Sequence, residues 1–136
     1  PPAAAHPASP MPTLFERIVA GEIPCRKVWE DDDHLAFLDI APRVDGHTLV
    51  IPKRPADYLF DLESEAYLAL WSAVRTVEQQ LRTRLEAKRV LVYVVGWEVP
   101  HVHVHLLPTR DIADVPFPAP DPDAEARLDQ TLARLV

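Results

Sequence analysis

The sequence has few of the residues that build disulfides, thiolate metal sites and membrane spans. Cys25 is the single cysteine among 136 residues, so the chain cannot form an internal disulfide or a metal site of several thiolates. No apolar run approaches the roughly 18 residues that a membrane-spanning helix needs, and the N-terminal residues lack the basic and apolar regions of a signal peptide. We therefore expect a cytoplasmic protein with no membrane partner.

Positive charge is also scarce. The chain carries 14 Lys and Arg residues against 21 Asp and Glu residues, which gives a net charge of -7. Such a surface does not neutralise a phosphate backbone, so we expect no nucleic-acid partner. A small phosphorylated ligand remains possible, because a few imidazoles and backbone N–H groups can hold it in one pocket.

Proline is frequent, and it marks the N-terminal segment. PPAAAHPASP contains four of the 15 prolines, no charged side chain and no large apolar one, so its contacts cannot offset the entropy lost on ordering. We predict a disordered leader over residues 1–11, in which His6 has no function and Met11 marks an alternative start. A single domain is expected over residues 12–136.

The remaining sequence predicts an α+β fold. The spacing of apolar residues indicates a short helix over 13–20, a long helix capped by Asp61, and a single C-terminal helix over 123–136 that follows an irregular segment. β-branched and alternating patterns indicate five strands, at 26–31, 34–40, 47–53, 90–95 and 101–107. This order favours a five-stranded antiparallel sheet with the long helix packed on one face.

Three histidines at alternate positions, in HVHVHLLP (101–108), are the main functional signal. Side chains on a strand alternate between its faces, so His101, His103 and His105 share one face while Val102 and Val104 enter the core. We expect the imidazole face to border a polar cleft or solvent, because buried imidazoles need hydrogen-bond partners that valines cannot supply.

A metal site is one interpretation of the triplet. At ~3.3 Å per residue the Cα atoms of His101 and His105 lie about 13 Å apart, so at most two of the three rings could share an ion. Asp39, His47 or Glu98 would supply the remaining ligands. The sequence contains no HExxH motif, and the triplet contains no carboxylate. The metal interpretation therefore has no support from either feature.

A nucleophilic histidine agrees better with the spacing. A neutral imidazole, with a reference pKa of about 6.5, can attack phosphorus and form a covalent intermediate. If His103 attacks, a backbone carbonyl can hold its other nitrogen, His105 can bond a phosphate oxygen or the leaving group, and His47 can orient either ring. Solvated histidines on an edge strand are the third interpretation, and we favour it only for His34, which follows three aspartates.

Two stretches of the sequence carry a family resemblance. GWEVPHVHVHLLPTR resembles the signature of the histidine triad (HIT) superfamily of nucleotidyl hydrolases and transferases. The stretch LFERIVAGEIPCRKVWEDDDHLAFLDIAPRVDGHTLVIPKR looks like the N-terminal half of the family in its EIP, acidic-turn, FxDI and GHTLVIPK segments. Together they cover roughly residues 12–110.

The resemblance implies a metal-independent hydrolase that needs no cofactor. It would cleave at the α-phosphorus of a nucleoside monophosphate conjugate, such as a phosphoramidate, an acyl adenylate or a dinucleoside polyphosphate. His103 would form the nucleotidyl-histidine intermediate, His101 would shape its backbone setting, and His105 and His47 would assist. The ligand would be a purine nucleotide or its conjugate, and the protein a homodimer. A nucleotide sensor or interaction module with little turnover is the alternative.

The resemblance also implies the residues that bind the nucleotide. The base pocket, the ribose contact at Asp39 and the phosphate side would comprise Leu14, Phe15, Ile18, Phe37, Leu38, Asp39, Ile40, Gly96, Trp97, Glu98 and Val99. The apolar pattern by itself makes Phe15 and Phe37 core residues instead.

The chain departs from many relatives beside the phosphate. Trp97 replaces a Gln, Glu98 stands where Ser is common, and the preceding strand, VLVYVV, lacks an Asn. A carboxylate beside a phosphate repels it unless it is protonated or turned away. Some bacterial members hold a structural zinc on cysteines near the first helix, but Thr13 and Glu16 occupy that region here, so we expect no zinc.

Overall fold

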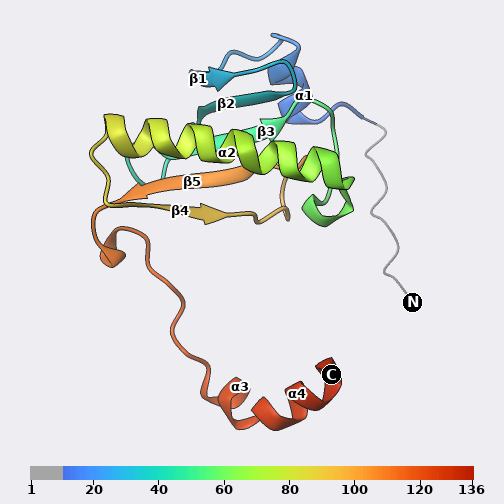
Figure 1. The fold of residues 1–136 in the computed structure, drawn as a ribbon, viewed down its shortest axis with the longest axis vertical. Helices are drawn as coiled ribbons and strands as arrows, with labels where there is room; N and C mark the ends of the chain where they lie inside the picture. Colours follow the sequence, from blue (N-terminus) through green and yellow to red (C-terminus); the bar gives the residue numbers. More distant parts are fainter. Residues whose placement is uncertain (1–10) are drawn as a thin grey trace.

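The computed structural model describes residues 11–136, and a five-stranded antiparallel sheet forms its centre (Figure 1). The strands lie side by side in the order β1-β2-β3-β5-β4. Their bounds are β1 (Lys27–Glu30), β2 (His34–Leu38), β3 (Thr48–Pro52), β4 (Arg89–Tyr93) and β5 (Val104–Thr109). The predicted α+β class and antiparallel sheet are therefore confirmed.

The last strand begins later than predicted. β5 starts at Val104, because the backbone before it bonds outside the sheet. The N–H of His101 donates to the carbonyl of Val99 at 2.8 Å, and the N–H of Val102 donates to the carbonyl of Ala56 at 2.7 Å. The first two members of the histidine triplet therefore lie in a loop that leads into β5.

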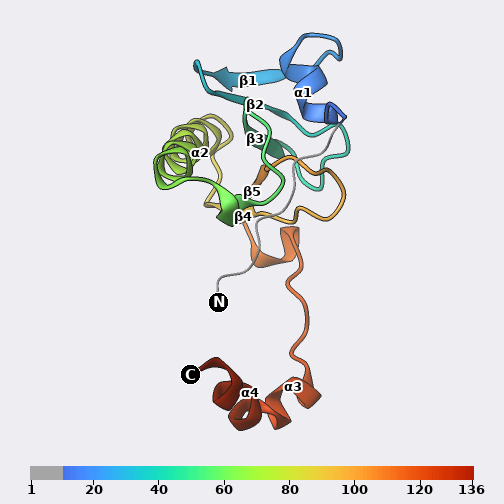
Figure 2. The same cartoon turned by 90° about the vertical axis from the view of Figure 1, so that its right-hand side faces the viewer.

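One long helix, α2 (Ser64–Arg84), covers one face of the sheet, as predicted (Figure 2). The predicted cap at Asp61 is wrong: the N-cap is Glu63. Asp61 ends a short 3-10 helix, η1 (Leu59–Asp61), in which its N–H donates to the carbonyl of Tyr58. The helix buries its apolar stripe against inward-facing strand residues, and the cluster includes Leu70, Val74, Val77, Leu81, Ala36, Val50, Val104 and Leu106.

The opposite face of the sheet carries the short helix α1 (Leu14–Val19), which Thr13 caps as predicted. Phe15 of this helix packs in a second buried cluster with Leu35, Phe37, Leu49 and Ile51. Residues of β2 and β3 thus alternate between the two clusters, as the period of a strand requires. The histidines described below lie on the α1 side of this sheet.

The C-terminal segment differs from the predicted single helix. A short 3-10 helix, η2 (Ile112–Asp114), precedes an extended stretch, and two helices follow it, α3 (Pro122–Ala126) and α4 (Leu128–Leu135). They break at Arg127, whose N–H donates to the carbonyl of Ala124 three residues back and so ends α3 with a 3-10 bond. Both helices stand away from the sheet (Figure 1), with their apolar side chains exposed.

Two further sequence predictions concern the N-terminal leader and membrane spans. The predicted leader, with His6, lies outside the described residues except for Met11, which is exposed. Within residues 11–136, no helix has the length and apolar character needed to cross a membrane.

Gly46 provides a test of the packing that positions the loop before His47. Its φ is +85°, and a Cβ there would collide with Leu85 and lie 3.2 Å from Cγ of Pro108. Gly21 has a similar φ of +81° but open space around it. Gly46→Ala should therefore cost well above the ~1 kcal/mol of left-handed strain that Gly21→Ala carries. Urea unfolding measures both variants, and equal losses would contradict the close packing.

Candidate active site

The three histidines of the triplet lie on the α1 side of the sheet. The ring of Phe15 contacts the rings of His101 and His103, with centroids 5.6 and 4.8 Å away. The centroids of His103 and His105 are 5.0 Å apart. Val102 and Val104 belong to the cluster under α2 on the other side. The predicted alternation is therefore confirmed, although only His105 belongs to the regular strand.

His101 corrects the expectation that all three rings border a polar cleft, because it is fully buried. Its Nε2–H donates to the carbonyl oxygen of Pro52 at 2.8 Å, and its Nδ1 accepts from the hydroxyl of Thr13 at 2.8 Å. Burial lowers the pKa of His101, although the bond to Pro52 opposes the shift. Both ring nitrogens are satisfied by groups remote in sequence, which the triplet alone could not indicate.

His103 has the geometry predicted for a nucleophile. Its Nδ1 lies 2.7 Å from the carbonyl oxygen of His101. A carbonyl only accepts, so the ring proton is on Nδ1 and the lone pair is on Nε2. The side chain is largely buried, with 7% of the residue exposed. The predicted backbone acceptor is therefore the carbonyl of a neighbouring member of the triplet.

His47 and His105 form a directed pair. The backbone N–H of Arg43 donates to Nδ1 of His47 at 3.1 Å, so the proton of the neutral His47 ring lies on Nε2. That Nε2–H donates to Nδ1 of His105 at 2.9 Å. The proton of His105 must then lie on its own Nε2, which makes His105 a hydrogen-bond donor to a ligand. The sequence indicated the two histidines but not the part played by Arg43.

Both rings of this pair are held neutral. Burial, together with the neighbouring His103 and His47 rings, lowers the pKa of His105 to about 4. Burial also lowers the pKa of His47, partly offset by Asp39. The hydrogen bonds from Arg43 to His47 and from His47 to His105 require both rings to be neutral.

Asp39, His47 and His105 are the part of the site that best resembles a metal centre. One ligand atom from each lies within 4.8 Å of the others, and Oδ2 of Asp39 is 3.5 Å from Nε2 of His47. The donor set does not fit a resident ion, because Nε2 of His47 carries a proton while Arg43 occupies Nδ1. An ion would have to replace the bond between the two histidines.

The residues predicted to bind the base and ribose fall into a buried group and a more exposed group. Phe15 and Phe37 are each 4% exposed and belong to the second core cluster, as their apolar pattern predicts. Others lie at the rim: Leu14 and Ile40 are exposed, while Ile18, Leu38 and Asp39 are half-buried. Oδ1 of Asp39 accepts from the N–H of Ala41 at 2.8 Å, so Oδ2 is the atom nearer the histidines.

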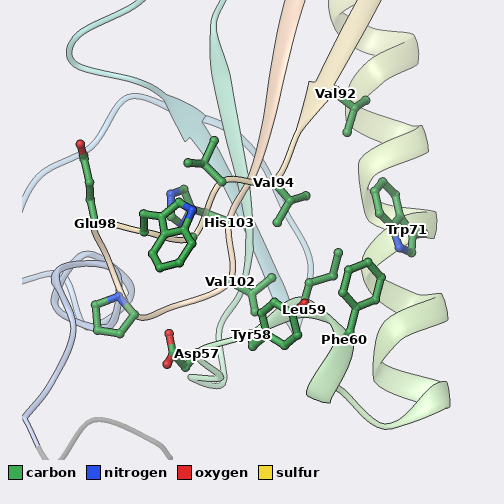
Figure 3. Close-up of a pocket in the computed structure, with 14 residues that line it drawn as sticks. Asp57, Tyr58, Leu59, Phe60, Trp71, Val92, Val94, Glu98, Val102 and His103 are labelled. Atoms are coloured by element: carbon green, nitrogen blue, oxygen red, sulfur yellow. The ribbon is translucent and has the colours of Figure 1, made fainter. Parts of the chain in front are cut away.

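A cavity of about 850 Å³ opens beside His103. Three of the predicted phosphate-side residues line it, namely Gly96, Trp97 and Glu98, whereas Val99 packs against the α1-side cluster. Figure 3 shows His103 on one side of this cavity and Trp71 of α2 on the other, with Tyr58 and Phe60 along the lower edge in this view. Sequence reasoning missed the wall formed by residues 57–60, which carry no motif.

The depressed histidine pKa values predict acid sensitivity. His47, His101 and His105 bind protons less readily when folded than when unfolded. The unfolded chain therefore binds more protons below pH 6.5, so stability is complete above that pH and falls as the pH drops toward 4. The melting temperature should fall as the pH is lowered from 7 to 5, and His105→Asn should make this fall smaller. An unchanged melting temperature over this range would contradict neutral burial of these rings.

Comparisons with known proteins agree with this geometry. A sequence model of the HIT domain matches residues 20–112. An uncharacterized HIT-like protein of Mycobacterium tuberculosis is 35% identical over 126 residues, which span 85% of this chain and 88% of the relative. Two of the similar solved structures come from Streptococcus mutans and Legionella pneumophila.

The Streptococcus mutans protein has a TM-score of 0.77 and 34% identity, covering 98% of this chain and 88% of its own. The HIT family hydrolase from Legionella pneumophila has a TM-score of 0.64 and 31% identity, covering 73% and 94%. The matched region contains every strand and all four histidines of the site. The chain therefore belongs to the HIT family.

Proposed function

We propose that the protein hydrolyses a nucleoside monophosphate conjugate at its α-phosphorus, through a nucleotidyl intermediate on His103. The observation that carries this proposal is the pairing of His103 Nδ1–H with the carbonyl of His101, which leaves the Nε2 lone pair of a cavity-lining ring for attack. The HIT family membership of the chain, and the Legionella pneumophila hydrolase among its neighbours, support it.

The reaction proceeds in two displacements at phosphorus. In the first, Nε2 of His103 bonds to the α-phosphorus and the bond from phosphorus to the leaving group breaks, while Nε2–H of His105 donates a hydrogen bond to the departing group, which takes its proton from solvent. The carbonyl of His101 then stabilises the positive charge on the nucleotidylated ring through Nδ1–H. In the second, water attacks the phosphorus and loses a proton to solvent, the bond from phosphorus to Nε2 of His103 breaks, nucleoside monophosphate leaves, and the ring of His103 regains its neutral form.

The rim of the site is proposed to bind a purine nucleotide. Leu14, Ile18, Leu38 and Ile40 offer apolar surface at or near the surface of the protein, and Asp39 offers a carboxylate for the ribose hydroxyls. Glu98 is exposed, so its carboxylate can point away from a phosphate. The exposed ring of Trp97 can cover the bound ligand from the cavity side.

Replacing the nucleophile tests the reaction directly. His103→Asn should lower kcat on a fluorogenic adenosine phosphoramidate by at least about 10³-fold, because the covalent route is lost. AMP affinity by calorimetry should change little. Wild-type protein quenched during turnover in alkaline denaturant, in which a bond from phosphorus to nitrogen survives, should also show the mass of one nucleotidyl group, located on His103 by peptide mapping at alkaline pH.

His34→Asn is the matched control for this experiment. The expectation that His34 is a solvated histidine on an edge strand is wrong: it is buried on the inner strand β2, and its ring pairs with Asp31 rather than with the triplet. This variant should keep wild-type kcat. Full turnover by His103→Asn, or an adduct on a different residue, would refute the proposed mechanism.

A nucleotide sensor with little turnover is the second candidate function. The observation that favours it is the replacement of the usual Gln and Ser by Trp97 and Glu98, both exposed beside the cavity. Binding of AMP or GMP without release of nucleotide from the phosphoramidate would establish this candidate. Loss of activity with a chelator would instead favour a metal-dependent hydrolase.

The protein is further proposed to be a homodimer. β4 is an edge strand, and Val92, Val94 and Val95 at its end are exposed next to the cavity. A second copy would cover this apolar edge, which a monomer leaves available for association.

Light scattering tests the dimer. The mass in solution should be twice 15.3 kDa, and Val92→Glu should shift it toward the monomer by placing a charge on the edge. Lys27→Glu, which changes a charge on the other edge strand, should leave the dimer intact. A monomer mass for the unaltered protein would refute the proposal.

A further inference from the structure

A buried hydrogen bond joins the start of helix α1 to the first histidine of the triplet. The hydroxyl oxygen of Thr13 lies 2.8 Å from Nδ1 of His101, and the two residues are 5% and 0% exposed. Thr13 is also the N-cap of α1, with its N–H bonded to Oε1 of Glu16 at 3.0 Å. One residue therefore serves both the helix terminus and the site.

The direction of this bond follows from its surroundings. Nε2 of His101 faces the carbonyl of Pro52, which can only accept, so the ring proton is on Nε2 and Nδ1 is an acceptor. The hydroxyl oxygen of Thr13 already accepts from the N–H of Glu16 at 3.0 Å. The hydroxyl proton of Thr13 is thus left for Nδ1 of His101, and one assignment satisfies every group.

The ring of His101 is held at both nitrogens, and this affects the nucleophile through the backbone. The carbonyl oxygen of His101 accepts from Nδ1–H of His103 at 2.7 Å. Any rotation of the His101 side chain and its peptide would move that acceptor. Phe15, two residues after Thr13, packs on the rings of His101 and His103, so α1 contacts this chain of groups at two points.

We propose that Thr13 is a positioning residue for the reaction: its hydroxyl, together with the carbonyl of Pro52, holds the ring of His101 as the Nε2–H tautomer, and through the His101 carbonyl it keeps Nε2 of His103 unprotonated and aimed at phosphorus. This inference rests on the proposed function, because it concerns the orientation of His103, the proposed nucleophile. Thr13 does not touch the reacting atoms.

Ring ¹⁵N NMR of the unaltered protein is the first test. At pH 7, His101 should show a protonated Nε2 and an unprotonated Nδ1, and His103 should show the reverse. A protonated Nδ1 on His101 would overturn the inference, whether or not any variant folds. Absence of turnover would refute the proposed function alone, because the tautomers are measured without substrate.

Thr13→Val and Thr13→Ser form the matched pair of variants. Valine keeps the shape but removes the hydroxyl, so we expect kcat to fall about tenfold, KM to change little, and the His101 and His103 signals to show mixed tautomers. Serine restores the donor and should recover kcat to within about threefold, with single tautomers. Wild-type kcat and tautomers in Thr13→Val would overturn the inference.

Glu16→Ala separates positioning from helix stability. It removes the acceptor for the Thr13 N–H but leaves the Thr13 hydroxyl and His101 bonded. Both Thr13→Val and Glu16→Ala should lower the melting temperature, but only Thr13→Val should change kcat and the ring tautomers. An equal loss of kcat in Glu16→Ala at equal stability would assign Thr13 a purely structural role and overturn the proposal.

Discussion

A neutral imidazole carries one proton, so each ring of the site donates from one nitrogen and accepts at the other. Backbone groups decide which nitrogen does which. The carbonyls of Pro52 and His101 can only accept, and the N–H of Arg43 can only donate. These three groups orient four rings. Pro52 orients His101, the carbonyl of His101 orients His103, and Arg43 orients His47, whose Nε2–H in turn orients His105. Burial lowers the pKa values of His47, His101 and His105, which keeps these three rings neutral and their hydrogen bonds intact.

The sheet explains how these groups meet. Pro52 ends β3, Arg43 precedes β3, and β5 pairs with β3 in the centre of the sheet. His47 and His105 come together because Thr48 and Leu49 pair with Leu106 and His105 across these strands. The α2 cluster on the opposite face buries Val102 and Val104, which directs the alternate imidazoles toward α1. Packing on one face thus determines the chemistry on the other.

Much of this arrangement could be predicted from the sequence, because it depends on local periodicity. Alternation placed His101, His103 and His105 on one side, and the apolar stripe of residues 64–84 required a helix on the other. The burial of His101 could not be predicted, because its partners, Thr13 and Pro52, come from separate elements. The misplaced cap at Asp61 and the break at Arg127 have a different cause. Short 3-10 turns compete with α-helix at helix ends and leave little trace in an apolar pattern.

The division of the site into a buried part and an exposed part has a chemical consequence. His101, His103 and Phe15 are nearly inaccessible to water, whereas Trp97, Glu98 and Ile40 are open to it. The proposed attack on phosphorus would depend on the first group, in which the ring of His101 is bonded at both nitrogens. Recognition of the proposed conjugate would depend on the second group, whose side chains can change without disturbing a hydrogen bond of the triplet. Under the proposed function, residues such as Trp97 and Glu98 would therefore affect the choice of leaving group while the proton arrangement around His103 stays the same.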